Sequence, residues 1–205
     1  MKKLFVISIL GGVSISMGGS AFVNAAPNMA LGGFLFSLGL FLIFQFKWGL
    51  YTGRVQNLVE VSVKSTVPDL IVLYFGNLLG TLSAGYVIRF CGKPSTLERV
   101  EEIVQNKLSS TNLEAFVLSI LCGIMVYAAV EGYKRVEDPV GKYLAFILPI
   151  MGFLFSGFEH SIANLFFISL ANAWGIEAII FSAIIAIGNL IGGCTIPLVH
   201  KLIKH

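Results

Sequence analysis

The chain alternates between long apolar stretches and short polar segments. A membrane-spanning helix needs about 20 consecutive, mostly apolar residues, and six stretches reach that length. These stretches are residues 4–24, 30–64, 67–90, 112–132, 143–173 and 176–200. The pattern predicts an all-α membrane protein with six transmembrane helices in one domain over residues 1–205.

Two of the six stretches are too long for one unbroken helix and contain polar interruptions. The stretch 30–64 includes Lys47-Trp48-Gly49-Leu50-Tyr51-Thr52-Gly53-Arg54, with two charges and two glycines. The stretch 143–173 includes Gly157-Phe158-Glu159-His160. Irregular backbone at bilayer depth is tolerated where it is buried in protein or lines a cavity. We therefore expect the second and fifth helices to be broken.

The composition excludes a predominantly soluble protein. Hydrophobic residues make up 56% of the chain, charged residues make up 12%, and the mean hydropathy is +0.86. A soluble domain carries roughly a quarter charged residues. The three cysteines are widely separated and lack metal-ligand spacing, so we expect no disulfide framework, no metal and no other cofactor.

The N-terminal stretch imitates a secretory signal peptide but is longer. Its apolar run from Leu4 to Val23 reaches the length of a spanning helix, so we expect a retained first helix. Lysine and arginine favour cytoplasmic loops. With the N-terminus inside, the inner side holds Lys2, Lys3, Lys64, Lys134, Arg135, Lys142, Lys201 and Lys204, and the outer loops hold Arg89, Lys93, Arg99 and Lys107. This bias predicts a multi-pass protein of the cell membrane with both termini in the cytoplasm.

An internal repeat relates the two halves of the chain. Gly76-Asn77-Leu78-Leu79-Gly80 in the third stretch returns as Gly188-Asn189-Leu190-Ile191-Gly192 in the sixth, 112 residues later. Each copy follows a stretch that we expect to be broken. Three stretches per half give the halves opposite orientations, and paired interrupted helices in such repeats indicate a site near the bilayer midplane. We therefore predict an inverted 3+3 repeat.

His160 and Thr52 are the polar candidates at the two breaks. The ordinary pKa of histidine, about 6.5, lets its surroundings decide whether the ring is charged. A charged ring would attract an anion, whereas a neutral ring could donate a hydrogen bond; the alternative is a buried histidine that only satisfies free backbone groups. The Thr52 hydroxyl and nearby amides could replace part of an anion's hydration shell. We expect Glu159 to be structural and to accept hydrogen bonds from backbone of the facing broken helix.

Other candidates surround these polar residues. Hydrophobic constrictions can gate a pore by dewetting. Candidates for such rings are Phe36, Leu40, Leu50 and Phe153. Lys107 lies in the polar connection 92–110 and could draw anions into an outer vestibule, although a solvated loop lysine is the simpler interpretation. Asn77 and Asn189 are buried amides of the type that joins helices by hydrogen bonds.

The chain carries a set of recognisable motifs. The most specific is Ser156-Gly157-Phe158-Glu159-His160-Ser161-Ile162-Ala163-Asn164. Weaker ones are Phe36-Ser37-Leu38-Gly39-Leu40, Leu50-Tyr51-Thr52-Gly53, Tyr74-Phe75-Gly76-Asn77-Leu78 and Gly188-Asn189-Leu190-Ile191-Gly192. Taken in order along the chain, these motifs resemble those of the formate/nitrite transporter family. The resemblance implies an aquaporin-like protomer of six helices, assembled as a homopentamer with one pore per subunit. It also implies transport of small monovalent anions, often together with a proton.

The resemblance further implies roles for individual residues. It assigns His160, Thr52, Lys107 and Asn189 to the substrate pathway, and Phe36, Leu40, Leu50, Tyr51 and Phe153 to the constriction. Glu159, Asn77 and Asn164 are taken as structural polar residues. Lys47 and Arg54 depart from the family, because the loop usually approaches its threonine through small and acidic residues and continues with a small polar one.

The sequence thus predicts a channel or transporter rather than an enzyme. Its expected cargo is formate, nitrite, hydrosulfide or a related weak-acid anion, with proton linkage through the central histidine. The expected partners are this anion, protons, the lipid bilayer and further copies of the chain, without nucleic acid. Alternatives are a channel for a neutral solute such as ammonia or water, an intramembrane enzyme, which the motifs support poorly, and a scaffold that transports nothing.

Overall fold

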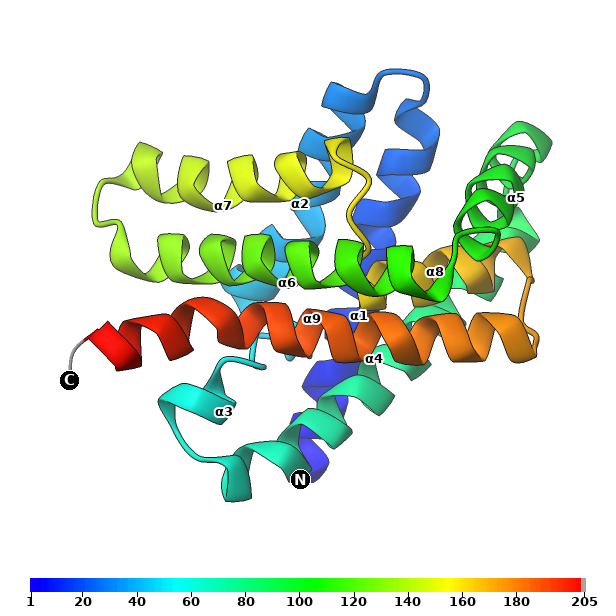
Figure 1. Ribbon diagram of the computed structural model, residues 1–205. Coiled ribbons are helices and arrows are strands. Elements are labelled where there is room, and N and C mark those ends of the chain that lie inside the picture. The colour runs from blue at the N-terminus through cyan, green and yellow to red at the C-terminus, as the bar shows by residue number, and fades with distance from the viewer. Residues whose placement is uncertain (204–205) are drawn as a thin grey trace.

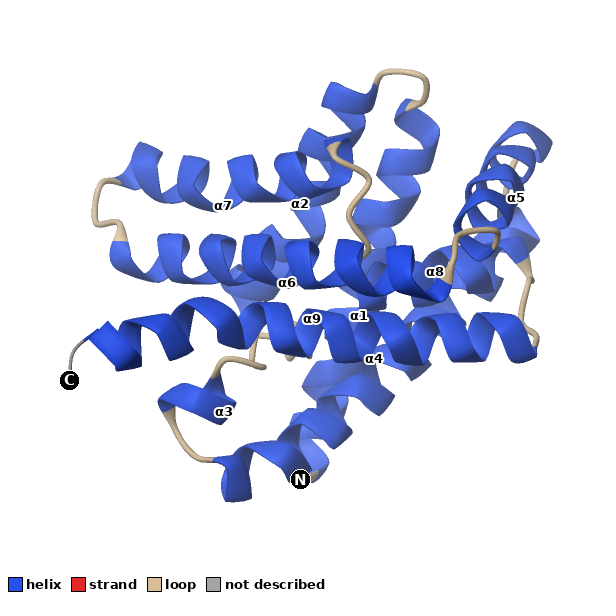
Figure 2. Ribbon diagram, in the orientation of Figure 1, coloured by secondary structure: helices blue, strands red, loops and turns tan. Residues whose placement is uncertain are grey.

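The computed structural model describes residues 1–203, and within them every regular element is a helix (Figures 1 and 2). The helices are α1 (Lys2–Ala25), α2 (Met29–Phe46), α3 (Asn57–Glu60), α4 (Val63–Cys91), α5 (Pro94–Leu108), α6 (Asn112–Arg135), α7 (Pro139–Phe155), α8 (Ser161–Ala171) and α9 (Ile176–Ile203). Lys204, which contributed to the predicted charge bias, lies outside the described residues.

Five of these helices are long and apolar enough to cross a membrane, namely α1, α2, α4, α6 and α9. The apolar helices α7 and α8 are shorter, with 17 and 11 residues. The predicted stretch 30–64 is divided among α2, α3 and the first residues of α4. Helix α2 ends because Lys47 takes a left-handed conformation, with φ of 56°, and its N–H bonds back to Ile43 O.

The polar connection 92–110 contains a helix that the hydropathy did not predict. Along α5, the side chains of Thr96, Val100 and Val104 are buried at intervals of four residues, while Glu98 and Glu101 are exposed. This is the pattern of an amphipathic helix lying on a protein surface. Polar residues outnumber apolar ones in the segment, so an average over it hides the narrow apolar face.

The long helices pack in two groups of three. Helix α1 lies against α2 and α4, and α6 lies between α7 and α9 (Figure 1). The closest approaches use small residues: a Cβ at Gly76 would overlap the Ser8 side chain of α1, and a Cβ at Gly188 would overlap the Ser119 side chain of α6. Close backbone packing through small residues is typical of helices within membranes. The short helix α8 contacts α1, α4, α5 and α9, so it lies between the two groups.

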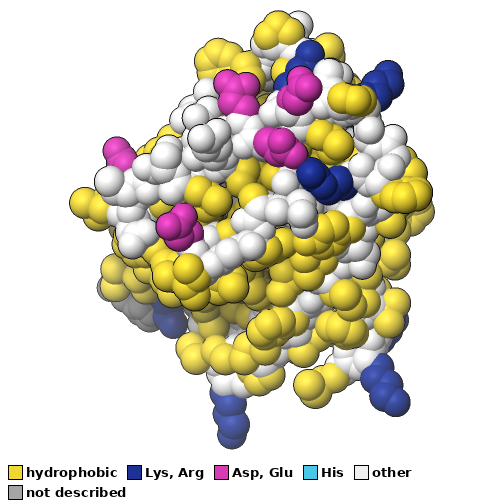
Figure 3. Space-filling view, turned by 90° about the vertical axis from the view of Figure 1, so that its right-hand side faces the viewer, with side chains coloured by type: hydrophobic (Ala, Val, Ile, Leu, Met, Phe, Trp, Pro, Cys, Tyr) yellow, Lys and Arg dark blue, Asp and Glu magenta, His cyan; other side chains and the backbone are white. Residues whose placement is uncertain are grey.

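Hydrophobic side chains cover most of the outer surface. Exposed apolar residues occur on every one of the long helices, and Figure 3 shows one such face, with charged side chains gathered mainly towards its upper part. Soluble monomers rarely expose contiguous apolar surface larger than a few hundred Å². Together with the five long apolar helices, this surface identifies a multi-pass membrane protein.

Candidate functional site

Two loops meet in the interior of the protein through Thr52 and His160. Thr52 belongs to residues 47–56 between α2 and α3, and His160 ends the connection between α7 and α8. The Oγ1 atom of Thr52 lies 3.0 Å from Nε2 of His160, and each residue is 2% exposed. The structure therefore brings together the two polar side chains that the sequence placed 108 positions apart.

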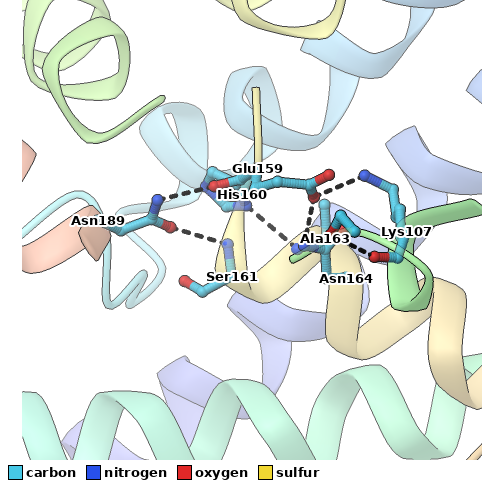
Figure 4. A network of polar contacts seen from close by, with 8 residues as sticks. Lys107, Glu159, His160, Ser161, Ala163, Asn164 and Asn189 are labelled. Atoms are coloured by element: carbon cyan, nitrogen blue, oxygen red, sulfur yellow. Dashed lines mark hydrogen bonds and ion pairs between the residues drawn. The ribbon is translucent and has the colours of Figure 1, made fainter. Parts of the chain in front are cut away.

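The hydrogen bonds of His160 define where the ring carries its proton. The Nδ1 atom accepts a hydrogen bond of 3.1 Å from the Ala163 N–H and so caps the N-terminus of α8 (Figure 4). An accepting ring nitrogen has no hydrogen, so the hydrogen of the neutral ring is on Nε2. Nε2–H then donates to Thr52 Oγ1. The hydroxyl hydrogen of Thr52 has no acceptor among residues 1–203 and remains available.

Asn189 on α9 holds the backbone on both sides of His160. Its Nδ2 donates to Glu159 O and to Ser119 O, each at 2.8 Å, and its Oδ1 accepts from Ser161 N at 2.8 Å. Residue 160 is therefore fixed between two bonded backbone groups. We call Asn189 and its three bonds the His160 clamp.

Asn77 on α4 makes the same set of bonds in the other half. Its Nδ2 donates to Gly49 O at 2.8 Å and to Ser8 O at 2.7 Å, and its Oδ1 accepts from Tyr51 N at 2.9 Å. The residue fixed between the two loop groups is Leu50. We call this set the Leu50 clamp.

The clamps bear on the roles predicted for the two asparagines. Both side chains are fully buried, and every strong hydrogen-bonding position of each amide except one acceptor lone pair is occupied by backbone. Asn77 agrees with its predicted structural role. Asn189 binds backbone through its amide and positions His160, and its place in the substrate pathway stays a prediction.

Glu159 has different partners from those predicted. Its Oε2 accepts from Lys107 Nζ at 2.6 Å and from Asn164 Nδ2 at 2.8 Å (Figure 4). The prediction that the Glu159 carboxylate accepts hydrogen bonds from backbone of the facing loop was wrong, because α5 brings the Lys107 ammonium group to it. Lys107 lies on this helix rather than in a loop, and its side chain is 20% exposed.

The ion pair between Lys107 and Glu159 gives a testable prediction. Lys107→Gln should lower the free energy of unfolding by about 2 kcal/mol or more, because it leaves a buried carboxylate without its cation. The double variant with Glu159→Gln should recover more than half of that loss. Thermal unfolding in detergent measures both effects, with Lys93→Gln, an exposed lysine before α5, as the control. Equal losses in the Lys93 and Lys107 variants would contradict the prediction.

Aromatic side chains enclose the His160 ring. The Phe153 ring stacks on it with centroids 5.7 Å apart and an interplanar angle of 16°. Phe36 meets Phe153 edge-on, with centroids 6.0 Å apart. Both phenylalanines are almost completely buried. An anion at Thr52 and His160 would therefore be surrounded by apolar groups and a few hydrogen-bond donors.

Two cavities have lining residues from the two loops that meet at this centre. One of about 520 Å³ is lined by residues that include Phe22, Arg99, Lys107 and Phe158, and Phe158 is two residues from His160 in the chain. The other, of about 190 Å³, is lined by Leu40, Ile43, Phe44, Lys47, Trp48, Leu50, Gly53, Arg54, Val130 and Lys134, and its Gly53 adjoins Thr52.

Tyr51 does not share the cavity that contains Leu40 and Leu50. Its hydroxyl donates to Ala186 O of α9 at 3.1 Å, and its ring meets Tyr74 of α4 edge-on. It lines an apolar cavity of about 360 Å³ between these helices. The Tyr51 side chain thus contacts α4 and α9, and its place in the constriction stays a prediction.

Comparisons with known proteins agree with these features. Residues 1–202 match the family model described as formate/nitrite transporter. The chain belongs to the formate/nitrite transporter family. The family resemblance inferred from the histidine motif is thereby confirmed.

Named relatives of this formate/nitrite transporter family member include formate channels. The chain is 34% identical over 148 residues to the formate channel FocA of Haemophilus influenzae, and the aligned region covers 67% of this chain and 52% of that protein. It is 30% identical over 185 residues to FocA of Escherichia coli strain K12, and that alignment covers 81% of this chain and 65% of that protein. The chain thus spans between about half and two thirds of the length of these relatives.

The fold of this family member matches a solved structure along its whole length. A pentameric formate channel with formate bound superposes with a TM-score of 0.84 at 26% sequence identity, covering 99% of this chain and 97% of that one.

The clamps were the part of the site that sequence reasoning missed. Ser8 and Ser119 accept through backbone, so their side chains carried no signal beyond their spacing of 111 residues.

Proposed function

We propose that this protein conducts small monovalent anions, of which formate is the first to test, past the contact between Thr52 and His160. The observation that carries the proposal is the chain of donors from Nε2–H of His160 to Thr52 Oγ1, which leaves the hydroxyl hydrogen free in an apolar, buried setting. Such a donor is preorganised for an anion that has lost its water. The formate channels among the relatives support the choice of cargo.

The mechanism follows from the cost of moving a charge through apolar surroundings. An anion that leaves either cavity loses water, and it can recover a hydrogen bond from the Thr52 hydroxyl, which is polarised by Nε2–H. A bare anion crosses hydrocarbon at great cost. Uptake of one proton from a hydronium ion converts the held anion into its neutral acid and a water molecule, which lowers that cost. In this proposal the Thr52 hydroxyl, polarised by His160, holds the anion for this step, and the protonation links transport to protons.

The scaffold belongs to the same proposal. Asn77 and Asn189, 112 positions apart, make equivalent bonds to Ser8 and Ser119 and to the two loops. This equivalence supports an inverted 3+3 repeat, in which α2 with its loop and α7 with α8 form the two broken spans. We further propose that the protein lies in the plasma membrane with both termini in the cytoplasm, and that the cavity of about 520 Å³ lined by Lys107 faces outward. We also propose that protomers form a homopentamer, because the similar solved channel is pentameric.

Flux into proteoliposomes tests the proposed function. Formate, nitrite and hydrosulfide should each enter down an imposed anion gradient. Entry should be several-fold faster at an external pH of about 6 than at about 8, because protonation lets the anion cross the apolar centre as its uncharged acid. Liposomes without protein are the control. Flux of ammonia or water without any flux of these anions would overturn the proposal and favour a channel for neutral solutes.

A further inference from the structure

The small cavity beside Leu40 and Leu50 has a cationic wall that the mechanism above does not use. We call it the Arg54 cavity, after its half-buried arginine. Its volume of about 190 Å³ is many times the minimum of about 10–15 Å³ that one water molecule requires. A formate, a nitrite or a slightly larger carboxylate therefore fits, together with part of its hydration shell.

The charges around the Arg54 cavity are predominantly positive. Lys47, Arg54 and Lys134 line it, and no acidic residue does so. Lys134 is paired with Glu131 at 2.7 Å. Within residues 1–203, no carboxylate lies within 4 Å of the charged groups of Lys47 or Arg54. An anion entering this cavity thus meets two uncompensated cations.

Arg54 is held at a defined place in the pathway. Its backbone N–H donates to Tyr51 O at 3.0 Å, which closes the turn that also contains Thr52. The preceding part of that turn is fixed by the Leu50 clamp. Arg54 is thus two residues from Thr52 in the chain. It shares its cavity with Leu40 and Leu50, two residues of the predicted constriction, and we call the passage between these two leucines the slit.

Arginine and lysine recognise anions differently. A guanidinium presents parallel N–H groups that match the two oxygens of a carboxylate, whereas an ammonium acts as a point charge. The apolar residues of the cavity, Leu40, Ile43 and Phe44 among them, lower the local dielectric constant and strengthen such a contact. Lys47 and Lys134 therefore attract any anion, while Arg54 distinguishes anions by shape.

We propose that Arg54 forms a second anion site, at the mouth of the slit, that selects planar anions with two oxygens over anions that present a single atom. Carboxylates and nitrite are selected, and hydrosulfide is disfavoured. The selected anion waits at the guanidinium, partly dehydrated, before it passes Leu40 and Leu50. This inference rests on the proposed anion transport, whose cargo class it narrows.

Two substitutions at Arg54 separate charge from shape. In proteoliposomes, Arg54→Gln removes both the positive charge and the pair of parallel N–H groups that a two-oxygen anion uses. It should raise the half-saturating concentration of formate about tenfold and that of hydrosulfide less than about threefold. Arg54→Lys keeps the charge, so it should lower the preference for formate over hydrosulfide several-fold while hydrosulfide flux stays near wild type. Lys64→Gln, an exposed cation outside the cavity, should change neither. Unchanged selectivity in Arg54→Lys would overturn the proposal.

Chemical labelling tests the site without flux and without a variant. Phenylglyoxal reacts with accessible arginine, and peptide mass spectrometry can follow Arg54 separately from Arg89, Arg99 and Arg135. Formate should slow labelling of Arg54 at least threefold relative to chloride at equal ionic strength, and should not slow labelling of Arg135. Protection of Arg54 without any anion flux would refute the proposed transport but retain the site. Equal protection by formate and chloride would refute the site.

Discussion

His160→Ala is expected to reduce formate flux in proteoliposomes at least tenfold. The substitution removes two hydrogen bonds: the one that Nε2–H donates to Thr52 Oγ1, and the one that Nδ1 accepts from the Ala163 N–H. Loss of a helix N-cap costs about 1 kcal/mol, so the protein should still fold while its pathway loses the group that polarises the Thr52 hydroxyl. Stopped-flow measurement of formate uptake at matched protein density gives the result directly.

A second variant at the same position separates capping from transport. Asparagine is a favoured N-cap residue, so His160→Asn can accept from the Ala163 N–H and keep α8 in place. We expect His160→Asn to unfold at nearly the wild-type temperature, yet to lose formate flux at least tenfold, as His160→Ala does. Full formate flux in either variant would show that His160 has only a structural role.

Asn77→Ala and Asn189→Ala are expected to be strongly destabilising. Each leaves one loop N–H and one loop carbonyl without a partner and removes a further bond to a carbonyl inside a helix. An unsatisfied buried group costs about 1–3 kcal/mol, so the loss of free energy of unfolding should be about 2 kcal/mol or more for each variant. Thermal unfolding in detergent, followed by tryptophan fluorescence, measures it.

Asn106→Ala is the matched control for the clamps. This amide is exposed on α5 and makes no side-chain hydrogen bond within the described part of the chain, so its removal should leave the unfolding temperature within about 1 °C. If the clamp variants unfolded at the temperature of the Asn106 variant, the clamps could not be what holds Leu50 and His160. A clamp variant that folds but loses only flux would assign the asparagine to the pathway after all.

Hydropathy predicted the spanning helices well because burial in lipid requires long apolar runs. The predicted stretch 176–200 lies within α9, and 112–132 lies within α6. Hydropathy averaged over a window did not predict α5, because only three buried residues among charged ones pack this helix against the protein. It also joined residues 30–64 into one stretch, because the hydrophobicity of Leu50 and Val55 masks a loop.

Sequence alone determined the family and the two candidate residues of the centre, since His160 and Thr52 are chemically conspicuous in apolar surroundings. Only the tertiary structure decided their partners. The hydrogen bonds from Asn189 to backbone, the ion pair between Lys107 and Glu159, and the hydrogen bond from Tyr51 to α9 all join residues far apart in the chain. Backbone groups are the same at every position, so no residue pattern shows which of them a side chain will bind; packing of the helices makes that choice.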